Sequence, residues 1–290
     1  MFLKSIEHIR NIVIILLILA LTVCISVIFL STDIAFAQTA EDEIYYGYHF
    51  YSNAGNTTHD ETIQYARKEI ESTLINNNYP IILNNNNQLT NFCAPVAGAS
   101  LVTFYDRYFD NLIPDATVGY FRNGDYYYYP MVVNSAKIQN VINTLYTSMG
   151  TNTVEPGTTQ NMFKNGLQSY INGKGRSISY NNVMSGNELD IEEIISNLVD
   201  GKPIVLYVLN YQLAKLVSNN ASDVLTYSNF NANHIMVAYG YYKVKYFDSS
   251  DVNFRTEILL KVSSGIVGWS EAYYRVDGYG ILNDAEAVRV

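Results

Sequence analysis

The chain is poor in cysteine. Its 290 residues include two, Cys24 and Cys93, and only Cys93 lies beyond the apolar N-terminal run. A single thiol excludes an intramolecular disulfide in that later part of the chain. Because exported proteins often use cysteine in pairs, we expect Cys93 to be either a buried packing residue or a reactive group.

Several other chemical signatures are missing. One cysteine and scattered histidines give no metal-site spacing, no glycine-rich run has the pattern of a phosphate-binding loop, and no serine lies in a nucleophile elbow. We therefore expect neither a metal nor another cofactor. The sequence also has no proline-rich linker, no long block of one charge and no internal repeat.

Basic residues are outnumbered by acidic ones, which gives a net charge of −9 at pH 7. An acidic surface repels polyanions, so nucleic acid and anionic membranes are not expected as partners. Tyrosine, by contrast, is abundant, with 26 residues. Tyrosine-rich surfaces can bind sugars, although biased codon use can produce the same composition.

The first 37 residues have the order of an export signal. Lys4 and Arg10 precede an apolar run, Asn11–Leu30, and Ala35-Phe36-Ala37 provides a cleavage site before Gln38. The run is about 20 residues long, so an uncleaved membrane anchor is the alternative. We expect cleavage, which predicts a secreted or cell-surface protein with no stable membrane association afterwards.

Helical patterns dominate the first half of the chain and strand patterns the second. Apolar residues that recur every three to four positions predict helices over Thr58–Ile75, Ala94–Phe109, Asn134–Met149, Thr159–Asn172 and Glu188–Val199. Runs rich in β-branched and aromatic residues predict strands over Ile44–Tyr51, Pro203–Leu209, His234–Tyr242, Phe254–Ser263 and Ala272–Val276. This segregation indicates an α+β fold with a helical lobe and an antiparallel-sheet lobe.

Cys93 and His234 each begin a predicted element, one in each lobe. Helix N-terminal amides and a nearby imidazolium lower the pKa of a thiol and produce the nucleophilic thiolate. Cys93 stands where a helix starts, and His234, 141 positions later, opens a strand. The pair therefore predicts a nucleophile and a base that face one cleft. His49 and His59 have no neighbours that suggest catalysis, and we expect them to be surface or packing residues.

Three stretches carry a family resemblance. They are NFCAPVAGASLVTFYDRYF around Cys93, DGKPIVLYV with NHIMVAYGY around His234, and LLKVSSGIVGWSEAYYRVDG near the C-terminus. Together they resemble papain-like cysteine peptidases, in particular streptopain and the bacteriocin-leader peptidases. The resemblance covers roughly residues 88–278 and is continuous only around these motifs. It implies a papain-like α+β domain over 81–290, preceded by an N-terminal segment or short propeptide over 38–80.

The resemblance also implies roles for individual residues. Cys93 would attack a peptide carbonyl, and His234 would take its proton and pass it to the leaving amine. The backbone N–H of Cys93 would form half of an oxyanion hole. A glutamine supplies the other half in the family, and here Gln88 is preferred on chemistry although Asn87 has the better spacing. The family's orienting Asn or Asp is replaced in the gapless pairing by Ser263.

The acidic turn that follows the histidine strand offers another candidate for the residue that orients His234. If His234–Phe247 and Phe254–Ser263 are the arms of one hairpin, Ser263 and Ser264 lie beside the imidazole. Asp248 then lies about 45 Å away along a straight strand. We therefore predict Ser263 as the orienting residue, with Asp251 as the alternative if the hairpin is broken.

These observations lead to a functional prediction. We expect an exported thiol peptidase from a Gram-positive bacterium, acting on a peptide or protein substrate through a Cys–His acyl-enzyme. A cell-wall amidase or acyl transferase would use the same pair of residues. A surface-binding protein built on an inactive peptidase scaffold is the alternative from another class.

Overall fold

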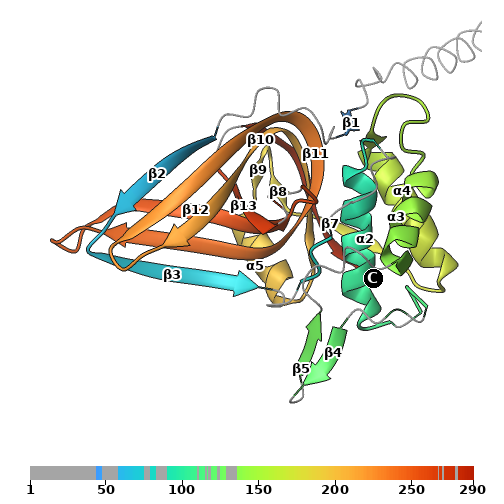
Figure 1. Cartoon of the computed structure of the whole chain (residues 1–290), viewed down its shortest axis with the longest axis horizontal. Helices are drawn as coiled ribbons and strands as arrows, with labels where there is room; N and C mark the ends of the chain where they lie inside the picture. Colours follow the sequence, from blue (N-terminus) through green and yellow to red (C-terminus); the bar gives the residue numbers. More distant parts are fainter. Residues whose placement is uncertain are drawn as a thin grey trace, which may run out of the picture. The chain divides into compact units, whose positions relative to one another are not determined.

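Figure 1 shows the computed structural model of the chain. The structure describes residues 44–47, 58–74, 79–82, 90–109, 111–114, 116, 119–122, 125–128, 136–266, 268–269, 271–277 and 280–290. All of these belong to one compact unit, Ile44–Val290. The predicted signal peptide and the side chains of His49, Asn87 and Gln88 lie outside the described residues.

The described part of the chain combines four helices with a large antiparallel sheet, which confirms the predicted mixture of α and β structure. The helices are α2 (Cys93–Asp106), α3 (Ala136–Ser148), α4 (Gln160–Gly173) and α5 (Ile191–Val199). Side-chain caps mark two of the starts. The Thr159 hydroxyl accepts a hydrogen bond from the Met162 amide at 3.2 Å, and the Asp190 carboxylate accepts one from the Glu193 amide at 3.0 Å.

The main sheet has the strand order β2-β11-β12-β13-β10-β14-β7, and β3 also pairs with β11. Its strands are β2 (Thr58–Gln64), β3 (Arg67–Leu74), β7 (Ser179–Asn182), β10 (Ile204–Ser218), β11 (Ser222–Phe247), β12 (Asn253–Ser263), β13 (Glu271–Arg275) and β14 (Gly280–Arg289). Since β11 also pairs with β10, the strands β10 to β13 form a closed ring of pairings. The sequence patterns did not predict β14.

Three two-stranded sheets complete the described secondary structure. They pair β1 (Tyr45–Tyr46) with β6 (Thr158–Thr159), β4 (Gly119–Arg122) with β5 (Asp125–Tyr128), and β8 (Met184–Ser185) with β9 (Glu188–Leu189). The first of these ties the beginning of the described chain to the residues just before α4.

The helix predicted over Thr58–Ile75 is wrong, because this segment forms two consecutive strands, β2 and β3, which pair with opposite ends of β11. Its apolar residues recur at helical spacing, but they do not share a buried face. Ile63 is buried, whereas Ile70 is 49% exposed. The long strand β11 offers both segments a pairing edge, and tertiary pairing of this kind overrides local propensity. Removal of residues 38–80 would therefore remove two strands from the sheet.

Helices α2, α3 and α4 pack closely beside the sheet (Figure 1). Small residues of α2 make this approach possible. A β-carbon added at Gly98 would lie 3.0 Å from Met149 Cε and 3.1 Å from Leu145 Cδ1. The whole of α2 is buried between the sheet and its neighbouring helices. The N-terminal end of α2 is thereby held in a fixed position.

The central part of β11 separates two apolar clusters. Ile235, Val237 and Tyr239 pack with the residues of α2, α3 and α4. Met236 and Ala238 point to the other side, into a cluster with α5 and the neighbouring strands. Side chains alternate across a strand, so β11 contributes to both clusters in its stretch beginning at His234.

We predict that Gly166→Ala destabilises the protein. A β-carbon there would lie 2.5 Å from Met149 Cγ and 2.7 Å from Met149 Cα. Overpacking of this kind costs about 1–3 kcal/mol, which exceeds the gain of about 1 kcal/mol from alanine's helix propensity. Urea unfolding should therefore give a lower free energy of unfolding for the variant.

Gly173→Ala, at the end of the same helix, is the matched control. Nothing lies within 4 Å of its added β-carbon, so its free energy of unfolding should stay the same or rise. Equal stabilisation by both substitutions would contradict the close packing of α3 on α4.

Candidate active site

Cys93 is the first residue of α2 and is 5% exposed. Asn91 precedes it in a left-handed conformation, with φ 55°, which asparagine tolerates. The Asn91 side chain donates a hydrogen bond to Asn152 Oδ1 at 2.9 Å, which ties this turn to the loop after α3. No acidic residue lies in the first turn of the helix. The positive end of the helix dipole, where Cys93 lies, therefore has no carboxylate on that turn.

His234 lies in β11, opposite Val208 of β10, and is 1% exposed. Its Nε2 lies 2.8 Å from the backbone carbonyl oxygen of Ser264. A carbonyl can only accept, so Nε2 carries the proton and Nδ1 is the ring nitrogen that can accept one. The ring of Tyr211 stacks on the imidazole, with centroids 5.1 Å apart and planes inclined by 18°.

Cys93 and His234 line one small cavity. The side chains and backbone around it belong to Phe92, Cys93, Val96, His234, Ser264, Gly265 and Ile266. Its volume of about 10 Å³ is about the room that one water molecule needs. The structure thus brings together the two residues that the sequence analysis singled out, and it encloses them.

Residue 265, in the wall of this cavity, has to be glycine. Its φ is +73°, and an added β-carbon would lie 2.9 Å from Val96 Cγ1. A side chain here would be strained and would meet α2. The turn after β12 can therefore approach the helix of Cys93 closely only because this residue is glycine.

The predicted orienting residue, Ser263, lies next to the residue that contacts the imidazole. Ser263 pairs with Val237 at the end of β12, and the group at His234 Nε2 is the carbonyl of Ser264. The residue that contacts the ring is therefore the neighbour of the predicted one, and it does so through its main chain. A main-chain carbonyl leaves no signature in the sequence, so this contact could not be found from residue types.

The acidic turn lies at the far end of the hairpin. Asp251 is 73% exposed on its side chain and pairs with Arg67 at 2.6 Å. The Asp248 carboxylate accepts hydrogen bonds from the amides of Ser250 and Val252 within its own turn. Neither acid lies at the imidazole. His59, in β2, is exposed and stacks on Tyr227 at 5.0 Å, which confirms its prediction as a surface or packing residue.

Sequence reasoning missed the part that β1 has in this region. The Gly47 amide donates to the Asn233 carbonyl at 3.2 Å, and the Asn233 side chain donates to the Tyr45 carbonyl at 3.0 Å. Tyr46 is buried, and this burial is the main reason that its pKa is raised to about 12. Strand β1 therefore lies against the residue before His234.

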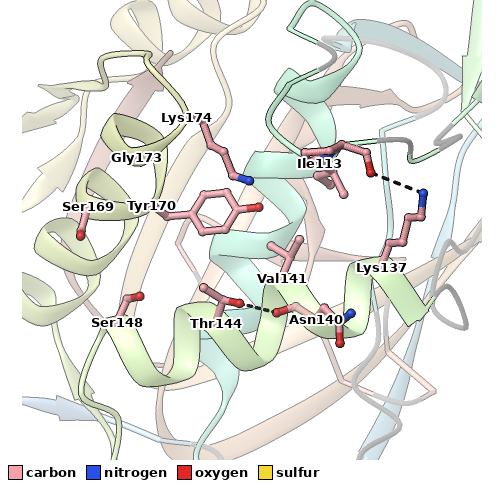
Figure 2. A pocket seen from close by; sticks show the side chains of 11 residues that line it. Ile113, Lys137, Asn140, Val141, Thr144, Ser148, Ser169, Tyr170, Gly173 and Lys174 are labelled. Carbon is pink, nitrogen blue, oxygen red and sulfur yellow. Dashed lines mark hydrogen bonds between the residues drawn. The ribbon is translucent and has the colours of Figure 1, made fainter.

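Two wider pockets lie elsewhere. One, of about 500 Å³, lies between α3 and α4, with Lys137 on one side and Tyr170 and Lys174 on the other (Figure 2). The other, of about 570 Å³, is lined by Tyr105, Arg289 and their neighbours. Neither shares a residue with the Cys93–His234 cavity.

Among the described residues, no three His, Cys, Asp or Glu side chains gather to hold a metal ion. None of the described helices is both long enough and apolar enough to span a bilayer.

No family model, curated protein or solved structure matches this chain. Its function must therefore be inferred from the residues of the site and their chemistry.

Burial dominates the electrostatics of the site. The pKa of His234 is lowered to about 4, because desolvation disfavours the charged ring, and the hydrogen bond to Ser264 only partly opposes this. At neutral pH the imidazole is therefore uncharged. It is available to accept a proton at Nδ1.

We predict that this burial makes the protein less stable in acid. The folded-state pKa of His234 is about 4 and the ordinary value is 6.5, so between these values the unfolded chain binds one more proton. The free energy of unfolding should fall as the pH drops through this window. At 1.36 kcal/mol per unit, the His234 contribution is about 3 kcal/mol.

Carboxylates titrate in the same pH range, so the contribution of His234 is measured by comparing variants with the wild type. Urea unfolding at pH 6.5 and pH 4 should show a smaller loss for His234→Gln than for the wild type. His59→Gln, at an exposed position, should behave as the wild type. Equal losses for all three proteins would show that His234 is not buried in its neutral form.

Proposed function

We propose that this chain is an exported papain-like thiol peptidase, with Cys93 as the nucleophile and His234 as the base. One observation carries the proposal: two residues 141 positions apart line one cavity, and the imidazole has its Nε2–H bound to a carbonyl. That bond leaves Nδ1 as the proton acceptor, which a general base requires. Buried helix α2 presents the thiol, and the sheet presents the histidine.

In the proposed reaction, Cys93 Sγ attacks the carbonyl carbon of a peptide bond and its proton moves to His234 Nδ1. The tetrahedral intermediate collapses, the C–N bond breaks, and the imidazolium returns the proton to the leaving amine. Water, deprotonated by the same ring, then hydrolyses the thioester. The backbone N–H of Cys93, in the first turn of a helix, is suited to stabilise the oxyanion.

The buried pair favours a neutral resting state. An imidazolium–thiolate pair would place two charges where desolvation already lowers the pKa of His234 to about 4. Proton transfer would therefore accompany attack on the substrate. This predicts a thiol that reacts less readily at rest than an exposed thiolate.

Substrate cannot enter the cavity as it stands. A volume of about 10 Å³ excludes an acyl group, so the walls formed by Ser264, Gly265 and Ile266 must separate from α2 during turnover. This closed state is also the observation that favours the alternative of a binding protein on an inactive scaffold. A cell-wall amidase would use the same dyad, and its substrate distinguishes it from a peptidase.

We predict that Cys93→Ala abolishes hydrolysis of an unfolded protein substrate, while His234→Ala lowers kcat by about 10²–10⁴-fold. Mass spectrometry of the quenched reaction should capture an acyl adduct on Cys93. His59→Gln should retain wild-type turnover. Purified peptidoglycan, assayed in parallel for release of amino groups, reports amidase activity.

The rate of Cys93 alkylation by iodoacetamide tests the dyad independently of substrate. His234→Ala should slow it at neutral pH, because the base that accepts the thiol proton is gone. If Cys93→Ala retains turnover, Cys93 is not the nucleophile. Unchanged alkylation in His234→Ala would remove His234 from the proposed pair.

A further inference from the structure

The carbonyl that binds His234 is held by the hydroxyl of its own residue. Ser264 Oγ donates a hydrogen bond to the Trp269 carbonyl at 2.7 Å and accepts one from the Ile266 amide at 3.1 Å. The Trp269 amide in turn donates to the Ile266 carbonyl at 3.0 Å. One buried side chain thus organises the turn after β12. The direction of the Ser264 carbonyl follows from that turn.

An aromatic stack holds the imidazole from the other side. Tyr211 stacks on His234, and Phe230 stacks on Tyr211 with centroids 5.0 Å apart and planes inclined by 7°. The Trp269 ring meets Phe230 edge-on at 6.1 Å. The contacts therefore form a circuit that runs from the imidazole through Ser264, Trp269, Phe230 and Tyr211 back to the imidazole.

A distortion of the sheet places Tyr211 in this stack. The register between β10 and β11 shifts between Leu209 and Tyr211. Asn210, at the shift, has φ 51°, a left-handed conformation that costs free energy for a residue other than glycine. Bulges near functional sites re-aim side chains. Without this one, the regular alternation of β10 would be preserved and Tyr211 would lie on the opposite face.

We propose that Ser264 and Tyr211 are positioning residues that together hold His234 as the Nε2–H tautomer, with Nδ1 as the base for Cys93. Ser264 acts through its carbonyl, whose direction its hydroxyl sets, and Tyr211 acts by fixing the plane of the ring. A peptide carbonyl cannot donate a hydrogen bond, so it specifies the tautomer without ambiguity. This inference rests on the proposed function only for its effect on turnover.

The ring nitrogens of His234 provide the direct test. Two-dimensional ¹H–¹⁵N NMR of the full chain labelled at histidine, assigned with His234→Gln, should show a protonated Nε2 and an unprotonated Nδ1 at pH 7. In Ser264→Ala and in Tyr211→Leu the Nε2–H signal should broaden or be replaced by a mixture of tautomers. kcat should fall about tenfold, as for the loss of one hydrogen bond, with KM unchanged.

Conservative variants separate positioning from packing. Ser264→Thr keeps the hydroxyl and should restore the Nε2–H signal, and Tyr211→Phe keeps the stacked ring and should do the same. Ser100→Ala is the matched control, because Ser100 is also buried and donates to a carbonyl, that of Pro80, at 3.0 Å. It should lose similar stability and leave both the signal and kcat unchanged.

Each outcome decides the proposal. A wild-type His234 protonated on Nδ1 overturns it, whatever the activity. The proposal is also overturned if the Nε2–H signal and kcat are unchanged in Ser264→Ala and Tyr211→Leu, because both residues would then have only a structural role. If the NMR results hold but Cys93→Ala retains turnover, the positioning role stands and the proposed function fails. If Ser264→Ala does not fold, Tyr211→Leu against Tyr211→Phe gives the same decision.

Discussion

Strand β11 imposes the main constraint on this molecule, because its pairings with β2, β3, β10 and β12 must all be satisfied at once. Its side chains alternate between the helical cluster and the opposite cluster of the sheet. A slip of one residue would exchange these faces and bury the wrong set. His234 lies directly before the alternating residues Ile235–Tyr239, so its position relative to α2 is set by the packing of the whole strand.

An element could be predicted from the sequence when its structure is determined by residues within the element itself. The periodic apolar positions of α2 to α5 lie within each helix, so they indicated four elements directly. The segment Thr58–Leu74 is different, because its partner β11 lies more than a hundred positions later and decides its structure. Strand β14 was missed because its acidic residues mask the strand pattern. Glu286 is buried, yet it is bound by Lys164 and Tyr207.

The residues of the candidate site also differ in whether they could be predicted from the sequence. Cys93 and His234 could be proposed from residue type and from their positions at the start of a helix and of a strand. The group that binds the imidazole could not, because it belongs to the backbone of Ser264. Nor could Tyr211, since its place in the stack depends on the irregular pairing at Asn210. Chemistry carried by side chains is visible in a sequence, whereas chemistry carried by main-chain geometry becomes visible only with the fold.

The identity of the group that binds the imidazole bears on the reaction that we propose. A carboxylate beside the imidazole would stabilise its cationic form, but it would add a second charge to a cavity of about 10 Å³. A carbonyl fixes the tautomer and offers only a partial charge. The site therefore combines strong orientation with weak stabilisation of imidazolium, which agrees with the lowered pKa of His234. If Cys93 and His234 act as we propose, such a pair is suited to transfer its proton in the transition state, once a substrate supplies the developing oxyanion.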